Sequence, residues 1–191
     1  RLFEVTGVQT CALPISSPVT QLVVTGEAEY MTERADKERL MKICRASSSM
    51  PLVSPIVNVD GVPYLDGGLA DSIPVKRAME YENDKIIVVL TRNPGYRKKP
   101  TSRGVKSLYR RAYRKYPNLV RAAIRRSMVY NHQMELVEKL EDEGKIFVLR
   151  PLIPTVSRLE KNYDTLMHFY EHGYRLMKRQ YQALREYLEK E

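Results

Sequence analysis

Residues 62–74 read VPYLDGGLADSIP, in which an apolar run leads to a carboxylate, two glycines and a proline. Glycines permit positive φ, and aspartate favours turns because its side chain bonds to nearby backbone groups. Proline suits the first turn of a helix, where its missing N–H costs nothing. The segment therefore predicts a strand, a turn that holds Asp66, and a helix from Pro74 to about Tyr81.

The residues before this segment predict a small sheet with a helix beside it. Asp-Gly at 60–61, between strand-like runs at 56–59 and 62–65, is a strong signal for a two-residue hairpin turn. A further short strand is predicted at 21–24. The apolar residues of 35–44 recur at helical spacing, so this stretch predicts an amphipathic helix.

The residues after the segment alternate between strand and helix. The continuous apolar run at 85–91 is typical of a strand covered on both faces. Strand, helix and strand in this order indicate an α/β architecture. The remaining pattern predicts helices over 105–116 and 118–143, a strand at 145–149 and a closing helix from about 162 to 191.

Length and composition fit a globular protein of 191 residues, which can form one domain with a sizeable core. No apolar run reaches the roughly 18 residues that span a bilayer, and no secretory signal is recognisable. We expect a cytoplasmic location, with peripheral contact at the inner face of the membrane.

Metal and disulfide chemistry has little support in the sequence. Cys11 and Cys44 are too few for a disulfide framework and lack metal-ligand spacing. His168 and His172 share one helical face and could bind a metal, but the glutamate of an H-E-x-x-H pattern is missing, which favours surface or packing roles. We predict neither a metal nor a cofactor.

Residues 5–15 read VTGVQTCALPI and do not resemble a native segment. The string has no charge and no periodicity, and it is identical to the in-frame translation of a common short-read sequencing adapter. Because eleven consecutive residues match, we set residues 1–16 aside as an artefact, and Cys11 with them. We expect the native sequence upstream of residue 17 to be lost.

A basic stretch runs from Lys85 to Met134, with fourteen Lys or Arg residues and no Asp or Glu. A solvated helical surface is the simplest interpretation. Interleaved tyrosines suit a membrane interface, where an anionic surface attracts each nearby basic residue by ~1 kcal/mol. A nucleic-acid-binding module or a non-catalytic interaction module is the alternative, although no reader motif is present. The candidate membrane or anion-binding residues are Arg97, Lys98, Lys99, Arg110, Arg111, Arg114, Lys115, Arg125 and Arg126.

Three blocks, in this order, resemble bacterial patatin-like phospholipases: RASSSMPLVSP at 45–55, YLDGGLADSIPV at 64–75 and KIIVVLTRNPGYRKKP at 85–100. The resemblance covers roughly Val23 to the C-terminus. It implies a three-layer α/β/α fold and a lipid or acyl-ester substrate hydrolysed by a Ser–Asp dyad without a metal. Asp66 would be the catalytic aspartate. The residues expected to support its loop are Gly67, Gly68, Ser47, Ser48 and Ser49.

The sequence departs from the family at the nucleophile. It contains no Gly-x-Ser-x-Gly and no glycine-rich oxyanion loop, both of which belong upstream of Val23. Ser47, Ser48 and Ser49 are not expected to replace the nucleophile, because none lies in a sharp strand-to-helix turn. We therefore expect 17–100 to be the C-terminal part of a truncated catalytic domain, 101–191 to be a mostly helical basic extension, and the polypeptide to be inactive.

Overall fold

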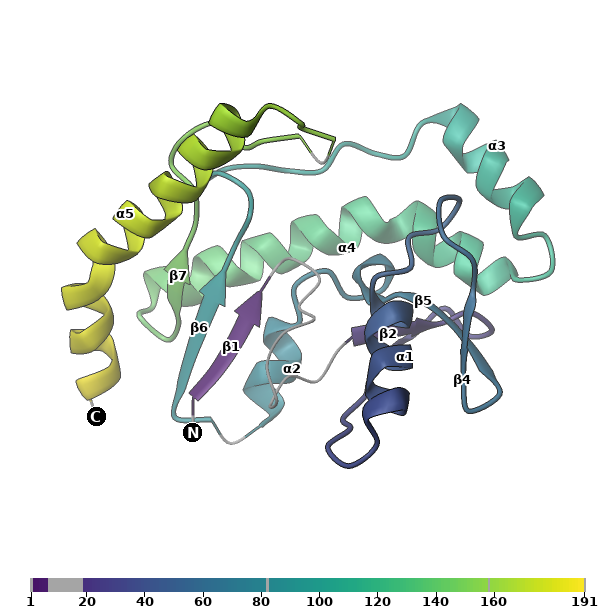
Figure 1. The fold of residues 1–191 in the computed structure, drawn as a ribbon, viewed down its shortest axis with the longest axis horizontal. Helices are drawn as coiled ribbons and strands as arrows, with labels where there is room; N and C mark the ends of the chain where they lie inside the picture. The colour runs from purple at the N-terminus through teal and green to yellow at the C-terminus, as the bar shows by residue number, and fades with distance from the viewer. Residues whose placement is uncertain (1, 7–18, 82, 158, 191) are drawn as a thin grey trace. The chain divides into compact units, whose positions relative to one another are not determined.

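The computed structural model describes residues 2–6, 19–81, 83–157 and 159–190 (Figure 1). It divides into two compact units, the first comprising Arg1–Val8, Pro74–Tyr96 and Glu135–Glu191 and the second comprising Gln9–Ile73 and Arg97–Met134. The elements in chain order are β1 (Leu2–Thr6), β2 (Val19–Leu22), β3 (Ala28–Tyr30), α1 (Lys37–Ser47), β4 (Val57–Val59), β5 (Val62–Asp66), the short 3-10 helix η1 (Gly67–Leu69), α2 (Val75–Glu80), β6 (Lys85–Val89), α3 (Arg103–Ala112), α4 (Pro117–Asp142), β7 (Phe147–Leu149) and α5 (Tyr163–Glu189).

The second unit is built around an antiparallel sheet with strand order β3-β2-β5-β4. Its β4–β5 hairpin turns at Asp60 and Gly61, whose φ values of 53° and 80° are those of a primed two-residue turn. The Asp-Gly hairpin prediction is therefore confirmed. Through the pairing of Thr20 with Asp66, β2 lies beside the end of β5.

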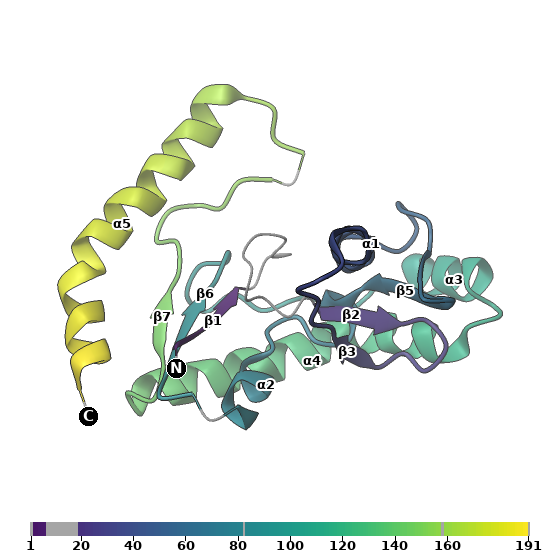
Figure 2. The ribbon, with the colours of Figure 1, turned by 60° about the horizontal axis from the view of Figure 1, so that its bottom comes forward.

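Both faces of this sheet are covered. Tyr64 packs in a cluster with Ile43 and Ala46 of α1, whereas Leu65 packs in a second cluster with Leu119 and Ala123 of α4. Successive side chains of a strand point to opposite faces, so α1 and the first part of α4 cover opposite faces of the sheet. Figure 2 shows α1 above the β2–β5 pair.

The α3–α4 segment packs onto the second of these clusters. Tyr109, Tyr113 and Tyr116 lie against it, and the Tyr113 hydroxyl accepts a hydrogen bond from the Leu52 N–H at 2.8 Å. Pro117 begins α4, as the predicted break at this proline requires. The segment predicted as two helices therefore forms two helices.

The first unit contains a parallel sheet with strand order β1-β6-β7. The central strand β6 is buried at Ile86, Ile87 and Val88, which confirms the predicted covered strand. The long helix α5 is tied to this unit by Tyr187, whose hydroxyl donates to the carbonyl of Lys145 at 3.0 Å.

Strand β1 is formed by residues 2–6, which we had set aside with the adapter-like string. Backbone hydrogen bonding to an open sheet edge requires no particular side chains. The pairing therefore does not test the adapter interpretation, which stays a prediction. The rest of the string, residues 7–15, lies outside the described residues.

The mixed α/β class is confirmed, but one local prediction is wrong and one strand was missed. The strand expected at 21–24 is observed at Val19–Leu22, because a turn begins at Leu22, whose carbonyl accepts the Gly26 N–H at 2.8 Å. Strand β3 was not predicted. The boundary predicted between residues 100 and 101 stays a prediction.

Candidate active site around Asp66

Asp66 is the last residue of β5, and its side chain is buried, with 7% exposed. Its N–H donates to the carbonyl of Ser49 at 2.9 Å, which joins the serine-rich loop to the end of the strand. One carboxylate oxygen, Oδ1, accepts the N–H of Gly68 at 2.8 Å. The structure therefore holds a carboxylate at a fixed place on a strand end, beside the loop that the sequence analysis assigned to its support.

The turn after Asp66 is fixed by its own backbone and by the Ser72 hydroxyl. Gly67 starts η1, and its carbonyl accepts the N–H groups of Ala70 and Asp71 at 3.0 and 2.8 Å. The Ser72 hydroxyl donates to the carbonyl of Gly68 at 2.6 Å. These bonds keep the Gly67–Gly68 backbone close to the Asp66 carboxylate.

Side chains far along the sequence contact the same turn. Arg126 of α4 donates from Nε to the Gly68 carbonyl at 2.8 Å. Gln133, also in α4, accepts the Ile73 N–H at 3.1 Å and donates to Asp71, which in turn accepts the hydroxyl of Tyr30. The sequence analysis did not assign this role to Arg126 and did not consider Gln133.

The three serines take different places at the end of α1. Ser47 and Ser49 are buried and Ser48 is exposed. The Ser49 and Ser48 hydroxyls donate to carbonyls of α1, at 2.7 Å to Arg45 and 2.8 Å to Cys44. Ser49 is bonded to Asp66 through its backbone carbonyl.

The predicted basic surface residues divide by exposure. Arg97, Lys98 and Arg126 are partly buried, and the Lys98 ammonium lies 3.9 Å from the centroid of the Tyr130 ring. Burial raises the pKa of Tyr109, an effect that the nearby charge of Arg126 opposes. The exposed residues of the set are Lys99, Arg110, Arg111, Arg114, Lys115 and Arg125.

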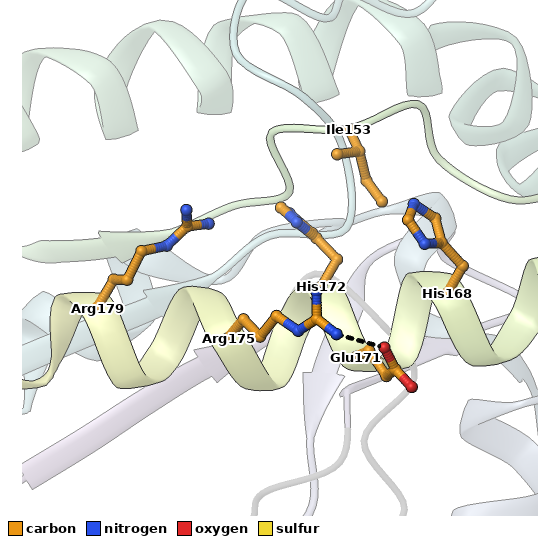
Figure 3. Close-up of a pocket in the computed structure, with 6 residues that line it drawn as sticks. All are labelled: Ile153, His168, Glu171, His172, Arg175 and Arg179. Carbon is orange, nitrogen blue, oxygen red and sulfur yellow. Dashed lines mark hydrogen bonds and ion pairs between the residues drawn. The ribbon is translucent and has the colours of Figure 1, made fainter.

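A separate hollow of about 150 Å³ lies in the first unit, where His168 and His172 of α5 face Ile153 (Figure 3). Residues 168–172 read HFYEH, an H-x-x-E-H order that occurs in some metalloproteases. However, Glu171 is paired with Arg175 at 2.8 Å, and His172 Nε2 accepts the Leu152 N–H at 3.1 Å. His172 therefore has a packing role at this hollow, which is one of the roles that the sequence analysis favoured.

Two negative findings apply to the part of the chain that the structure describes. Within it, no three His, Cys, Asp or Glu side chains gather closely enough to hold a metal ion. Within the same residues, no helix combines the length and the apolar character needed to cross a membrane.

The family model described as patatin-like phospholipase matches residues 1–79, which include Asp66 and its two glycines. This match supports a patatin-like family. The match begins within the residues that we set aside as adapter-derived and ends in α2.

The chain is also similar to a second family model and to one further protein. A second family model, a domain of unknown function named DUF6363, matches residues 116–189, from the start of α4 to the end of α5. The chain is also 38% identical over 56 residues to the uncharacterized protein YjjU of Escherichia coli strain K12. That similarity covers 29% of this chain and 16% of YjjU, so the chain spans only a small part of that relative.

Proposed function

We propose that the parent protein is a serine acyl hydrolase of the esterase or phospholipase A type, and that this chain carries the aspartate of its Ser–Asp dyad. The observation that carries the proposal is the buried carboxylate of Asp66 at the end of β5, oriented by the Gly68 N–H at 2.8 Å. A buried carboxylate that is fixed by a backbone donor can serve as a base in one defined direction. The patatin-like match over the same residues supports this chemistry.

In the proposed mechanism, the Asp66 carboxylate accepts the proton of a serine hydroxyl while the serine oxygen attacks the carbonyl carbon of the ester. Backbone N–H groups of the missing oxyanion loop would stabilise the tetrahedral oxyanion, and removal of one such donor costs ~10²–10³ in rate. The alcohol leaves with the proton. Asp66 then accepts a proton from the water that attacks the acyl-serine and returns it to the departing serine oxygen, and the fatty acid is released.

The serine is the part that this chain does not supply. Of the candidates in the sequence, Ser48 and Ser49 direct their hydroxyls to carbonyls of α1, which does not prepare either for attack. We propose that the nucleophile belongs to the native sequence that the adapter string replaces. The polypeptide as given would then be inactive, because members of a catalytic unit act together.

The experiment is a clean sequencing read across the adapter junction, followed by expression of the intact gene. We expect a Gly-x-Ser-x-Gly upstream, and we expect Asp66→Asn to lower ester turnover by about 10³-fold or more. The chain as given should show only background turnover, whether or not Asp66 is replaced. An upstream sequence without that motif, or full activity in Asp66→Asn, would contradict the proposal.

We also propose an anionic membrane surface as the partner of the exposed basic residues. In α3, Tyr109 is followed by the exposed Arg110 and Arg111. A hydrolase of lipids must reach a lipid interface, and the exposed arginines favour an anionic interface by their charge.

A further inference from the structure

The face of α4 that meets the sheet carries two polar residues in an apolar stripe. Leu119, Ala123 and Tyr130 are buried at helical spacing along this face. Arg126 lies four residues before Tyr130 and Gln133 lies three residues after it, so both fall on the same stripe. Both side chains are only partly buried. Polar residues at core-facing positions disagree with the local pattern, and such disagreements concentrate at functional sites.

Both polar residues end on the turn that follows Asp66. Arg126 Nε lies 2.8 Å from the carbonyl oxygen of Gly68, and Gln133 holds Asp71 and the Ile73 N–H. The two side chains are seven residues apart, which places them two turns apart on one helical face. Helix α4 therefore contacts this turn at two places, at Gly68 near the start of the turn and at Asp71 and Ile73 near the end of the turn.

The bond from Arg126 has a direct geometric link to Asp66. The Gly68 carbonyl accepts a hydrogen bond from Arg126 Nε, and the Gly68 N–H donates one to Asp66 Oδ1 at 2.8 Å. A Cβ at Gly68 would lie 3.1 Å from Asp66 Oδ1 and 3.7 Å from Arg126 Nη2, so the carboxylate and the guanidinium flank one point of the backbone. An arginine that is bonded to the carbonyl limits rotation of the Gly68 residue as a whole.

Arg126 directs its guanidinium to the Gly68 turn. Among the residues that the structure describes, the Gly68 carbonyl is its only hydrogen-bond acceptor, and it forms no ion pair. Its sequence neighbour Arg125 is exposed. The Gly68 carbonyl also accepts the Ser72 hydroxyl at 2.6 Å, but hydrogen bonds from a charged donor are stronger than neutral ones, so we expect Arg126 to contribute most to holding this carbonyl.

We propose that Arg126 is a positioning residue for Asp66, acting through Gly68 to orient the carboxylate. The inference rests on the proposed function, since it assigns to α4, in the region matched by DUF6363, a part in the Asp66 site. It concerns an amide and a carboxylate that are both present in this chain, so it can be tested without the missing serine.

The test follows the Gly68 amide by NMR while the Asp66 carboxylate is titrated with acid in the full chain. In the wild type the amide resonance should move as the carboxylate takes up a proton, because it is bonded to Oδ1; in Asp66→Asn this movement should be lost. Arg126→Met should lose most of the movement, whereas the matched variant Arg125→Met should retain it. Methionine suits an apolar stripe, so the variant is expected to fold.

Two further variants separate positioning from a general role in stability. Arg126→Lys should recover part of the movement, because it restores a cationic donor. Arg126→Gln provides a second uncharged variant if Arg126→Met does not fold. The inference is overturned if the movement persists in either uncharged variant, or if amides throughout the second unit change as much as Gly68. Failure of the proposed function would instead appear as an upstream sequence without a serine motif, with the Gly68 response intact.

Discussion

At the residue scale, Gly68 shows why this turn needs a residue without a side chain. Its φ is not in the left-handed region, so the requirement comes from space: a Cβ would lie 3.1 Å from Asp66 Oδ1. The carboxylate would have to move by a few tenths of an ångström, or its bond to the Gly68 N–H would have to lengthen. The second glycine of the motif is therefore explained by the proximity of the carboxylate to the backbone.

Gly68→Ala should accordingly reduce the free energy of unfolding by about 1 kcal/mol and disturb the Asp66 geometry. Gly104→Ala is the matched control, because a Cβ there meets nothing within 4 Å and lies in α3, where alanine favours the helix. Urea unfolding of both variants measures the difference. Equal stabilities for the two variants would contradict the explanation.

Tyr64 gives a second prediction at this scale, based on pH. Burial, followed by the hydrogen bond from its hydroxyl to Glu29 and the charge of that carboxylate, raises the pKa of Tyr64 to about 12. The folded state therefore favours the protonated phenol, and its contribution is present below the ordinary tyrosine pKa near 10 and lost as pH rises toward about 12.

Tyr64→Phe removes this titration, so its unfolding free energy should fall less steeply than that of the wild type between about pH 10 and 12. Tyr181→Phe, at an exposed tyrosine of α5, should follow the wild type. Denaturant unfolding at a series of pH values gives the slopes. Parallel curves for Tyr64→Phe and the wild type would show that the phenol titrates equally in both states.

At the scale of elements, the turn after β2 and the start of α4 approach each other closely. Gly26 has a φ of 76°, and a Cβ there would lie 2.7 Å from the carbonyl oxygen of Asn118. The Asn118 side chain also donates to the Val24 carbonyl at 3.1 Å. A side chain at Gly26 would therefore have to displace the backbone of α4 in addition to adopting an unfavourable conformation.

Gly26→Ala should destabilise the chain by about 2–4 kcal/mol, because both costs apply. Gly61→Ala is the control, since its φ of 80° is equally unfavourable but a Cβ meets nothing within 4 Å. It should cost only about 1 kcal/mol. Thermal unfolding of the two variants measures the contrast, and a cost at Gly61 equal to that at Gly26 would remove the role of the close approach.

The elements that the sequence predicts well are those set by local chemistry. Asp60-Gly61 specifies its own turn, and Pro117 specifies a helix start, so the hairpin and the α3–α4 break were both predicted. Strand β3 has only three residues and depends on pairing with β2, which leaves no local signal. Helix α3 begins before the predicted residue because Ser102 caps it by accepting the Val105 N–H.

The site itself was predicted in part. The turn at Asp66 and its glycines is recognisable from the sequence, and its catalytic role stays a prediction. Arg126, in contrast, contacts Gly68 from 58 residues away, and no local pattern encodes such a contact. A signal was nevertheless present. Arg126 interrupts the apolar stripe of α4, whereas Arg125 lies outside it, so the helical periodicity could have separated the two arginines that we grouped as one surface.

At the scale of the whole molecule, the two family matches meet in one compact unit. Asp66 lies within the patatin-like match, and Arg126 lies within the DUF6363 match that starts at residue 116. The hydrogen bond between Arg126 and Gly68 joins the two matched regions within the second unit. A prediction that separates the chain at residue 100 therefore divides residues that contact the same turn.

The proposed membrane surface yields a prediction for the whole chain. Replacing Arg110, Arg111 and Arg114 by glutamine removes three exposed charges and should weaken binding to anionic vesicles by about 3 kcal/mol, since each nearby basic residue contributes ~1 kcal/mol. The matched control replaces Arg175, Arg179 and Arg185, three exposed arginines of α5, with the same change in net charge. Vesicle flotation at fixed ionic strength, with neutral vesicles in parallel, gives the affinities. Equal losses in the two triple variants would indicate attraction by net charge alone, and preferential binding of duplex DNA or RNA over anionic vesicles would favour the nucleic-acid alternative.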